Sequence, residues 1–210
     1  MHPSHHAKSS PDKAAIIMAF SGQTTSYRQM DEGSNQLAHW FRSQGLNTGD
    51  AIALCLENHR RFFEICWAAQ RSGLYYTAIS SRLAADEVAY IVNNCRARLL
   101  ISSKALLETV IAALEETMPE KGAWLLDIAK DMEGPKPLRA LEPLWAMQPT
   151  CPIADESSGY DMLYSSGTTG KPKGVRIALS GEPIDEVKPL VSLAQKMYRM
   201  DESTVYLSPA

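Results

Sequence analysis

The chain contains, at residues 162–175, the stretch Met162-Leu163-Tyr164-Ser165-Ser166-Gly167-Thr168-Thr169-Gly170-Lys171-Pro172-Lys173-Gly174-Val175. An apolar triplet, typical of the end of a strand, precedes ten residues that include four hydroxyls, three glycines and two lysines. Glycines let backbone N–H groups converge on an anion, hydroxyls donate further hydrogen bonds, and lysine supplies a compact positive charge. This composition predicts a loop that binds phosphate.

The nearest alternative motif is the Walker A loop, Gly-x-x-x-x-Gly-Lys-Ser/Thr. Counting from Gly167 places Pro172 where that motif requires its second glycine, and Lys171 is followed by a proline rather than a hydroxyl that binds Mg²⁺. The alternation of Val175, Arg176 and Ile177 predicts a strand, whereas a Walker loop opens a helix. We therefore expect the loop to join two strands, and a P-loop NTPase or kinase ranks last. A solvated turn without a ligand stays open as the structural alternative.

The run 164–175 resembles the signature loop of the AMP-forming acyl-activating enzymes, which include acyl-CoA synthetases, peptide-synthetase adenylation domains and some luciferases. In that family the loop binds the β- and γ-phosphates of ATP while a carboxylate attacks the α-phosphorus. The resemblance assigns these contacts first to Ser165, Thr168, Thr169 and Lys173. The full set of phosphate-binding residues that it implies is Ser165, Ser166, Gly167, Thr168, Thr169, Gly170, Lys171, Lys173 and Gly174.

The resemblance implies an ATP-dependent acid–thiol ligase. Such an enzyme activates a carboxylic acid, here a fatty or related acid, as acyl-AMP and transfers it to CoA. It implies ATP and Mg²⁺ as cofactors, and a carboxylic acid and CoA as substrates. Many members of the family place a Thr-His pair shortly after the loop, where this chain has Ala178-Leu179. The sequence therefore matches the family more fully than it matches the acyl-CoA synthetase subclass.

Residues 1–210 are expected to form an incomplete N-terminal domain of such an enzyme. By resemblance, the adenine- and ribose-binding segments, the Mg²⁺-binding glutamate and the C-terminal domain with its lysine come later in the family's sequences. We therefore assign no complete catalytic set and no metal ligand within these residues, and expect the 210 residues alone to be inactive. The alternative is a non-catalytic fragment that binds a nucleotide or phosphate.

The order of apolar runs predicts an α/β fold. Residues 51–56 form a nearly all-apolar run of strand length, which is typical of a buried parallel strand. Because further strands alternate with helical patterns, we expect a doubly wound, largely parallel sheet flanked by helices. The other strands are expected at 75–79, 98–102 and 123–127, and the helices near 26–45, 58–73, 84–94 and 104–118.

Local signals refine the α/β unit, which we expect to occupy residues 1–128. Residues 14–19 and 23–25 predict a short hairpin, and Ser26 with Gln29 has the spacing of a capping box at a helix start. Asn58 is the expected cap of the next helix. The tail before residue 10 is expected to be solvated, and its three histidines have no cysteine or carboxylate close by in sequence to complete a metal site.

Three further segments follow residue 128. Residues 129–158 contain five prolines and little periodicity, and predict an extended connection. Residues 159–179 contain the phosphate-loop hairpin, and residues 180–210 are expected to form a helix and a strand. Strands without neighbours would leave sheet edges exposed, which predicts self-association.

The overall composition excludes several classes of protein. A net charge of -3 without a basic stripe gives no reason to expect nucleic acid. The four cysteines are widely spaced and follow no secretory signal, so reduced thiols are expected. No apolar run at the start of the chain is long enough to cross a bilayer. These features predict a cytoplasmic protein without a transmembrane segment.

Overall fold

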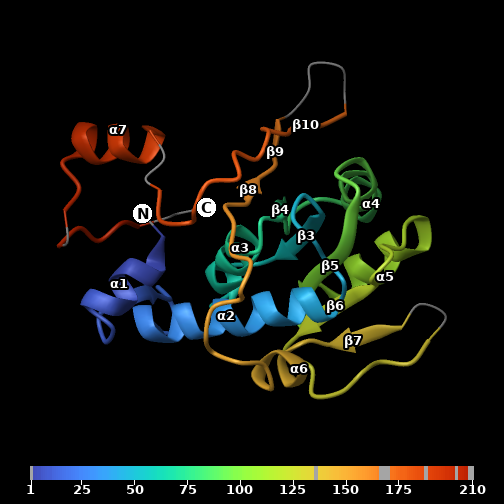
Figure 1. The fold of residues 1–210 in the computed structure, drawn as a ribbon. Coiled ribbons are helices and arrows are strands. Elements are labelled where there is room, and N and C mark those ends of the chain that lie inside the picture. Colours follow the sequence, from blue (N-terminus) through green and yellow to red (C-terminus); the bar gives the residue numbers. More distant parts are fainter. Residues whose placement is uncertain (1, 135–136, 166–170, 187–188, 202, 208–210) are drawn as a thin grey trace.

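The computed structural model describes residues 2–134, 137–165, 171–186, 189–201 and 203–207 (Figure 1). Its centre is a six-stranded sheet in the order β7-β6-β5-β3-β4-β8, in which every neighbouring pair is parallel. This confirms the α/β fold and the parallel sheet. The strands are β3 (Ala51–Leu56), β4 (Tyr75–Ser80), β5 (Ala97–Ser103), β6 (Ala123–Leu126), β7 (Leu138–Ala140) and β8 (Tyr160–Asp161).

The central strand β3 shows why the sheet forms where it does. All six of its residues are buried, and it pairs in parallel with β4 on one side and β5 on the other. After β3 the chain adds β4 on one side and then crosses to add β5, β6 and β7 on the other. The boundary between β3 and β5 is therefore a topological switch point, where open α/β sheets commonly bind ligands at their carboxyl edge.

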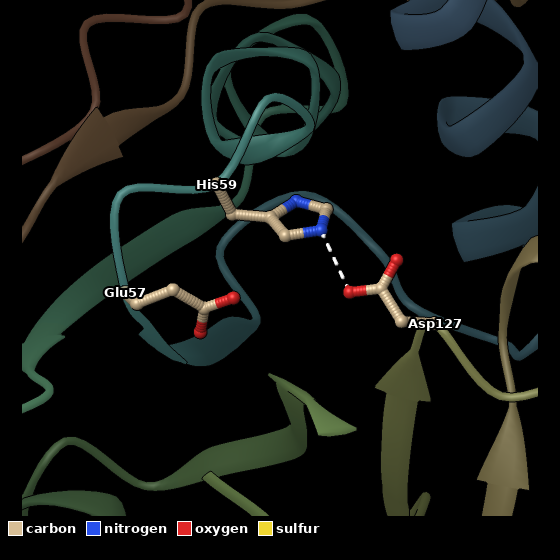
Figure 2. A group of neighbouring side chains, drawn as sticks. All are labelled: Glu57, His59 and Asp127. Carbon is tan, nitrogen blue, oxygen red and sulfur yellow. Dashed lines mark hydrogen bonds and ion pairs between the residues drawn. The ribbon is translucent and has the colours of Figure 1, made fainter. Parts of the chain in front are cut away.

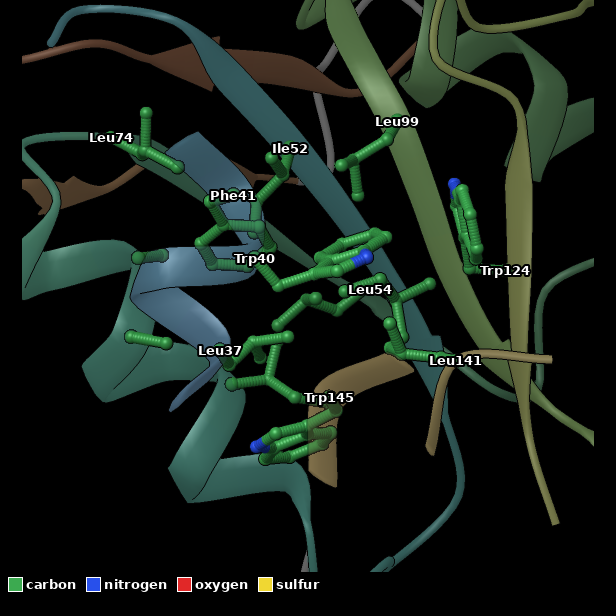
Figure 3. Close-up of a cluster of buried hydrophobic side chains, with 14 of the residues drawn as sticks. Leu37, Trp40, Phe41, Ile52, Leu54, Leu74, Leu99, Trp124, Leu141 and Trp145 are labelled. Atoms are coloured by element: carbon green, nitrogen blue, oxygen red, sulfur yellow. The ribbon is translucent and has the colours of Figure 1, made fainter. Parts of the chain in front are cut away.

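Helices cover both faces of the sheet. Side chains of α2 (Tyr27–Ser43) and α3 (Phe62–Arg71) form one buried cluster with Ile52 and Leu54 of β3 (Figure 3). Side chains of α4 (Ala85–Asn94) and α5 (Leu107–Glu116) form a second cluster with Ala53 and Cys55. Because successive residues of β3 point to opposite faces, the strand supplies both clusters, and the sheet is doubly wound as expected.

The start of α2 follows its sequence signal. Ser26 Oγ accepts the backbone N–H of Gln29 at 3.2 Å, and Gln29 Oε1 accepts the backbone N–H of Ser26 at 2.9 Å. These two bonds form the capping box that the spacing predicted. The hairpin before it is also confirmed, as β1 (Ala14–Ile17) and β2 (Thr24–Ser26) pair antiparallel.

The start of α3 corrects a prediction. The helix begins at Phe62, its N-cap is Arg61, and no side chain caps it. Asn58, the expected cap, lies four residues before the first helical residue. The intervening residues form a tight turn in which His59 Nδ1 accepts the backbone N–H of Arg61 at 3.1 Å. The turn occupies residues that the sequence pattern assigned to the start of the helix.

The N-terminal segment also differs from the expected solvated tail. Residues after His2 form α1 (Pro3–Ser9), which packs against α2. His2 is only 3% exposed, and its ring meets the ring of Trp67 edge-on with the centroids 5.0 Å apart. Burial, together with the nearby positive charge of Arg71, lowers the pKa of His2 to about 3. A neutral imidazole can therefore cover the apolar Trp67 ring.

The expected extended connection, 129–158, contains regular structure. It supplies the edge strand β7 and a short helix, α6 (Glu142–Ala146), whose Trp145 is 2% exposed and donates its indole N–H to the Gly33 carbonyl at 2.8 Å. Residues 147–158, which we call the strap, then run along α2. Its backbone carbonyls accept side-chain hydrogen bonds from one face of that helix, with the donor and acceptor residues Gln36 and Gln148, Asn35 and Thr150, and His39 and Cys151.

The last part of the chain adds α7 (Pro189–Tyr198). The strand expected near the end of the chain is not formed by residues 203–207, and residues 208–210 lie outside the described part. A short 3₁₀ turn, η1 (Lys104–Leu106), replaces the first residues expected for α5. Among the residues that the structure describes, no helix is both long enough and apolar enough to cross a membrane.

Candidate nucleotide-phosphate site

The predicted phosphate loop is flanked by two short strands. These are β9 (Leu163–Ser165) and β10 (Lys173–Val175), which pair antiparallel with Ser165 opposite Lys173. A strand therefore follows the loop, as predicted, and the helix that a Walker A loop would open is not found there. Pairing brings the hydroxyl of the entering strand and the ammonium of the leaving strand to the same end of the hairpin.

Four of the nine predicted phosphate-binding residues lie in the described part of the chain: Ser165, Lys171, Lys173 and Gly174. Ser166, Gly167, Thr168, Thr169 and Gly170 lie outside the described residues. Ser165, Lys171 and Lys173 are all exposed to solvent. A hydroxyl donor and two ammonium groups that solvent can reach are suited to an anion with several charged oxygens.

Two side chains of α4 hold the hairpin, one at β9 and one just before β10. The Tyr164 hydroxyl, on β9, donates to Asn94 Oδ1 at 2.6 Å. The Tyr90 hydroxyl donates to the Pro172 carbonyl at 3.1 Å, just before β10. Burial raises the pKa of Tyr164, and the neighbouring Cys95 and Tyr90 raise it further. The phenol therefore stays protonated near neutral pH and remains a donor to Asn94.

A glycine is required at position 174 because neighbouring side chains approach its Cα closely; its backbone angles do not demand a glycine. A Cβ at this position would lie 2.5 Å from Met162 Cε and 2.8 Å from Tyr164 Cζ. Any larger side chain would displace the Tyr164 ring, whose hydroxyl reaches Asn94. The glycine thus lets the ring lie across the hairpin.

The chain after β10 returns along the start of β4 and is held by one aromatic ring. The Arg176 guanidinium lies 4.1 Å from the centroid of the Tyr75 ring and donates to the Gly49 carbonyl at 2.8 Å. The Tyr75 hydroxyl donates to the Ile177 carbonyl at 2.7 Å. These supports were not predicted from the sequence, although tyrosines at otherwise apolar positions of β4 and α4 are a signal for them.

The described hairpin residues suit the phosphates of a bound nucleotide better than the Mg²⁺ that accompanies them. Lysine and serine side chains suit phosphate oxygens. Mg²⁺ in nucleotide sites is bound by phosphates together with one or two carboxylates. Residues 163–165 and 171–175 contain no carboxylate. The described hairpin therefore suits the polyphosphate, and we assign no Mg²⁺ ligand to it.

A second polar group lies at the carboxyl edge of the sheet (Figure 2). Glu57 follows β3, Asp127 follows β6, and His59 lies in the turn before α3; one potential ligand atom from each lies within 4.8 Å of the others. No local pattern in the sequence predicts this group. Its members come from separate loops, and only the parallel pairing of the strands brings them to one edge.

The hydrogen bonds of His59 favour a link between loops over a set of metal ligands. His59 Nδ1 accepts the Arg61 backbone N–H, so in a neutral ring Nε2 carries the proton. Nε2 then donates to Asp127 Oδ2 at 3.1 Å. A metal at Nε2 would need that nitrogen unprotonated, which would place the proton on Nδ1 against the Arg61 N–H. Glu57, in turn, accepts the Ser103 hydroxyl at 2.5 Å.

Comparison with known proteins identifies the family. The family described as "AMP-binding enzyme" matches residues 4–210. The chain therefore belongs to the AMP-binding enzyme family. This confirms the resemblance to the acyl-activating enzymes.

Curated relatives include a fatty acid ligase and a fatty acid transport protein. The fatty acid–[acyl-carrier-protein] ligase ScoC of Streptomyces coeruleorubidus is 32% identical over 183 residues, which cover 83% of this chain and 32% of that protein. Long-chain fatty acid transport protein 1 of Mus musculus is 28% identical over 183 residues, which cover 83% of this chain and 28% of that protein. The chain thus spans about a third of the length of the curated relatives that it matches.

Solved structures share the fold. The Mycobacterium tuberculosis fatty acyl CoA synthetase has a TM-score of 0.66 at 23% identity over 82% of this chain and 33% of its own. The anthranilate CoA ligase AuaEII, solved in complex with anthranoyl-AMP, has a TM-score of 0.68 at 19% identity over 82% of this chain and 32% of its own. At these identities the likeness establishes the α/β architecture.

Proposed function

We propose that this chain supplies the ATP-phosphate-binding hairpin of an AMP-forming acid–thiol ligase. The reaction activates a carboxylic acid as acyl-AMP, releases pyrophosphate, and transfers the acyl group to CoA. The observation that carries the proposal is the hairpin, in which a stretch of hydroxyls, glycines and lysines is mounted between paired strands on α4. The family assignment over residues 4–210 supports it.

The chemistry explains why a phosphate loop is needed. A carboxylate reacts poorly with a thiol because oxide is a poor leaving group, and AMP is a far better one. During adenylation the carboxylate oxygen bonds to the α-phosphorus while the bond to the β-phosphate oxygen breaks. Negative charge then builds on the departing pyrophosphate. Donors fixed in advance around that charge lower the barrier, and loss of one such donor typically costs about 10² to 10³ in rate.

Individual residues take distinct parts in this proposal. Lys173 and Ser165, opposite each other at the end of the hairpin, bind the β- and γ-phosphate oxygens together with the loop residues Thr168 and Thr169. Lys171 adds a second positive charge at the loop exit. Mg²⁺, when bound with ATP, would neutralise part of the phosphate charge. No residue acts as a general base, because the attacking carboxylate is already ionised.

A fatty or related acid is the proposed substrate, and CoA the proposed thiol acceptor. Several of the relatives are named for fatty acids, which supports this choice within a family that also activates aromatic acids, as the anthranilate CoA ligase shows. An exchange assay with fatty, aromatic and amino acids compared at equal concentration tests the choice. A clear preference for an aromatic or amino acid would overturn it.

The direct test of the proposed role is Lys173→Ala in the enzyme that carries this chain. We expect carboxylate-dependent ATP–pyrophosphate exchange to slow by about 10²-fold or more. Lys130→Ala, an exposed lysine outside the hairpin, is the matched control and should leave exchange unchanged. Equal rates for both variants would show that the hairpin does not serve adenylation.

The 210 residues alone are expected to show no such exchange. The family places adenine and ribose binding in segments other than those that match the hairpin. Weak binding of ATP without turnover is the outcome that we expect, and calorimetry separates it from a scaffold that binds nothing. Carboxylate-dependent exchange by the chain alone would overturn this part of the proposal.

A further inference from the structure

We propose that Tyr90 of α4 is a positioning residue for the phosphate loop. Its hydroxyl fixes the Pro172 carbonyl, and its ring holds the Lys171 ammonium near the loop exit, where a polyphosphate can reach it. This inference rests on the proposed function, since it names the residue that prepares one cation of that site. Lys171 is the cation in question, because Lys173 already has its place on β10.

One side chain holds two consecutive loop residues. The Tyr90 hydroxyl donates to the Pro172 carbonyl at 3.1 Å, and Lys171 Nζ lies 5.1 Å from the centroid of the Tyr90 ring. Proline has no backbone N–H, so its carbonyl is the one backbone hydrogen-bonding group that it offers. Ammonium groups within about 6 Å of an aromatic face are attracted by the ring quadrupole. Tyr90 thus makes a polar contact through its tip and a cation–π contact through its face.

The rest of α4 makes Tyr90 a rigid support. Tyr90 packs against the buried cluster formed by α4, α5 and the sheet. Asn94, four residues later and on the same face of the helix, accepts the Tyr164 hydroxyl of β9 at 2.6 Å. One helical face therefore holds the entering strand through Asn94 and the loop exit through Tyr90. Movement of the hairpin relative to the sheet would break both contacts.

The ring contact leaves the ammonium available to a ligand. Lys171 is exposed, so a bound polyphosphate can accept hydrogen bonds from its ammonium while the side chain stays over the Tyr90 ring. Before binding, the ring confines a side chain that would otherwise sample many rotamers. Confinement reduces the entropy lost on binding, which raises affinity without any contact between Tyr90 and the ligand.

A double-mutant cycle tests the coupling between ring and ammonium. Binding of inorganic pyrophosphate to the full chain is measured by calorimetry for Tyr90→Leu, Lys171→Met and the double variant. Loss of the ring and hydroxyl should weaken binding about two- to fivefold, and once Lys171 is methionine the same change should leave only the smaller effect of the lost Pro172 bond. If the two single effects multiply in the double variant, Tyr90 does not act through Lys171 and the proposal is overturned.

Two further variants separate the ring from the hydroxyl. Tyr90→Phe keeps the ring face and removes the bond to Pro172, so it should retain the coupling to Lys171. Tyr198→Leu, an exposed tyrosine on α7, is the matched control and should bind like the parent chain. Thermal unfolding of each variant shows whether a loss of affinity reflects lost folding. A Tyr90→Phe chain that is folded but lacks the coupling contradicts the ring contact.

An NMR measurement on the chain without ligand tests this proposal separately from the proposed function. In the free chain, the Lys171 side-chain methylene protons should show a ring-current shift in the NMR spectrum. The shift should persist in Tyr90→Phe and vanish in Tyr90→Leu. If wild type shows the shift but binds no pyrophosphate, the phosphate-binding role fails while the contact stands. If wild type shows no ring-current shift, the positioning role is overturned whatever the chain binds.

Discussion

The central strand β3 and the hairpin β9–β10 are built in opposite ways. Every residue of β3 is buried, and the strand has parallel neighbours on both sides. In the hairpin each strand has one partner, and Leu163 and Val175 are 63% and 54% exposed. Apolar burial thus holds the sheet, whereas a few tyrosine and asparagine contacts hold the hairpin. A rigid scaffold that presents an exposed polar loop is a common arrangement for binding sites.

Truncation of one leucine in each region tests this contrast directly. Leu54→Ala removes a fully buried side chain of β3 and should lower the free energy of unfolding by about 2–5 kcal/mol. Leu163→Ala removes an exposed side chain of β9 and should change it by about 0.5 kcal/mol or less. Urea denaturation measures both. Comparable losses would mean that the hairpin is part of the structural core.

Ion pairs give a second contrast between interior and surface. The Arg71 side chain is 1% exposed and contacts Asp31 at 2.7 Å and Glu156, on the strap, at 3.3 Å. Arg71→Met would leave two carboxylates without their cation and should cost about 3–5 kcal/mol of stability. Arg28→Met, which removes an exposed pair with Asp12, should cost about 0–1 kcal/mol. Chemical denaturation that finds no difference between the two variants would contradict a structural role for the buried Arg71.

The smallest expected effect is the pH response of the N-terminal segment. Because burial lowers the pKa of His2 to about 3, the folded segment holds a neutral ring, whereas the detached segment takes up a proton near pH 6.5. The contribution of His2 to the docking of α1 is therefore complete above pH 6.5 and is lost as the pH falls toward 3. The NMR signal of the Trp67 indole should report detachment of α1 in acid.

Two variants complete the pH experiment. His2→Phe keeps an aromatic ring against Trp67 without a titrating group and should make the Trp67 signal insensitive over this range. His5→Gln, at an exposed position, should behave like the parent chain. Identical acid profiles for the parent and His2→Phe would show that another group controls the docking.

The features that sequence predicted correctly depend on neighbouring residues. The capping box needs only Ser26 and Gln29, and the buried strand needs only the apolar run 51–56. A strand does follow the phosphate loop, but it is Lys173–Val175, and Arg176 and Ile177, whose alternation with Val175 predicted it, lie beyond its end. The contacts of the capping box lie within a few residues of one another. The all-apolar run of β3 itself requires burial on both faces of the sheet.

The features that were missed depend on distant partners. His2 is buried because Trp67 lies beside it, and Trp145 is ordered by the Gly33 carbonyl, 112 residues earlier in the chain. The strap lacks periodicity because side chains of α2, not a regular backbone pattern, satisfy its carbonyls. Likewise, the Tyr90 contact to Pro172 spans 82 residues. Local sequence patterns do not indicate such pairings, because the partners meet only when the sheet brings distant residues together.

The central claim is that the hairpin ending in Lys173 and Gly174 binds the polyphosphate of a nucleotide. Calorimetric titration of ATP into the chain and into its Lys173→Ala variant tests it most directly. We expect saturable binding by the parent chain and affinity weaker by about tenfold or more in the variant, because a charged hydrogen bond is lost. Equal affinity in the two proteins would contradict the claim.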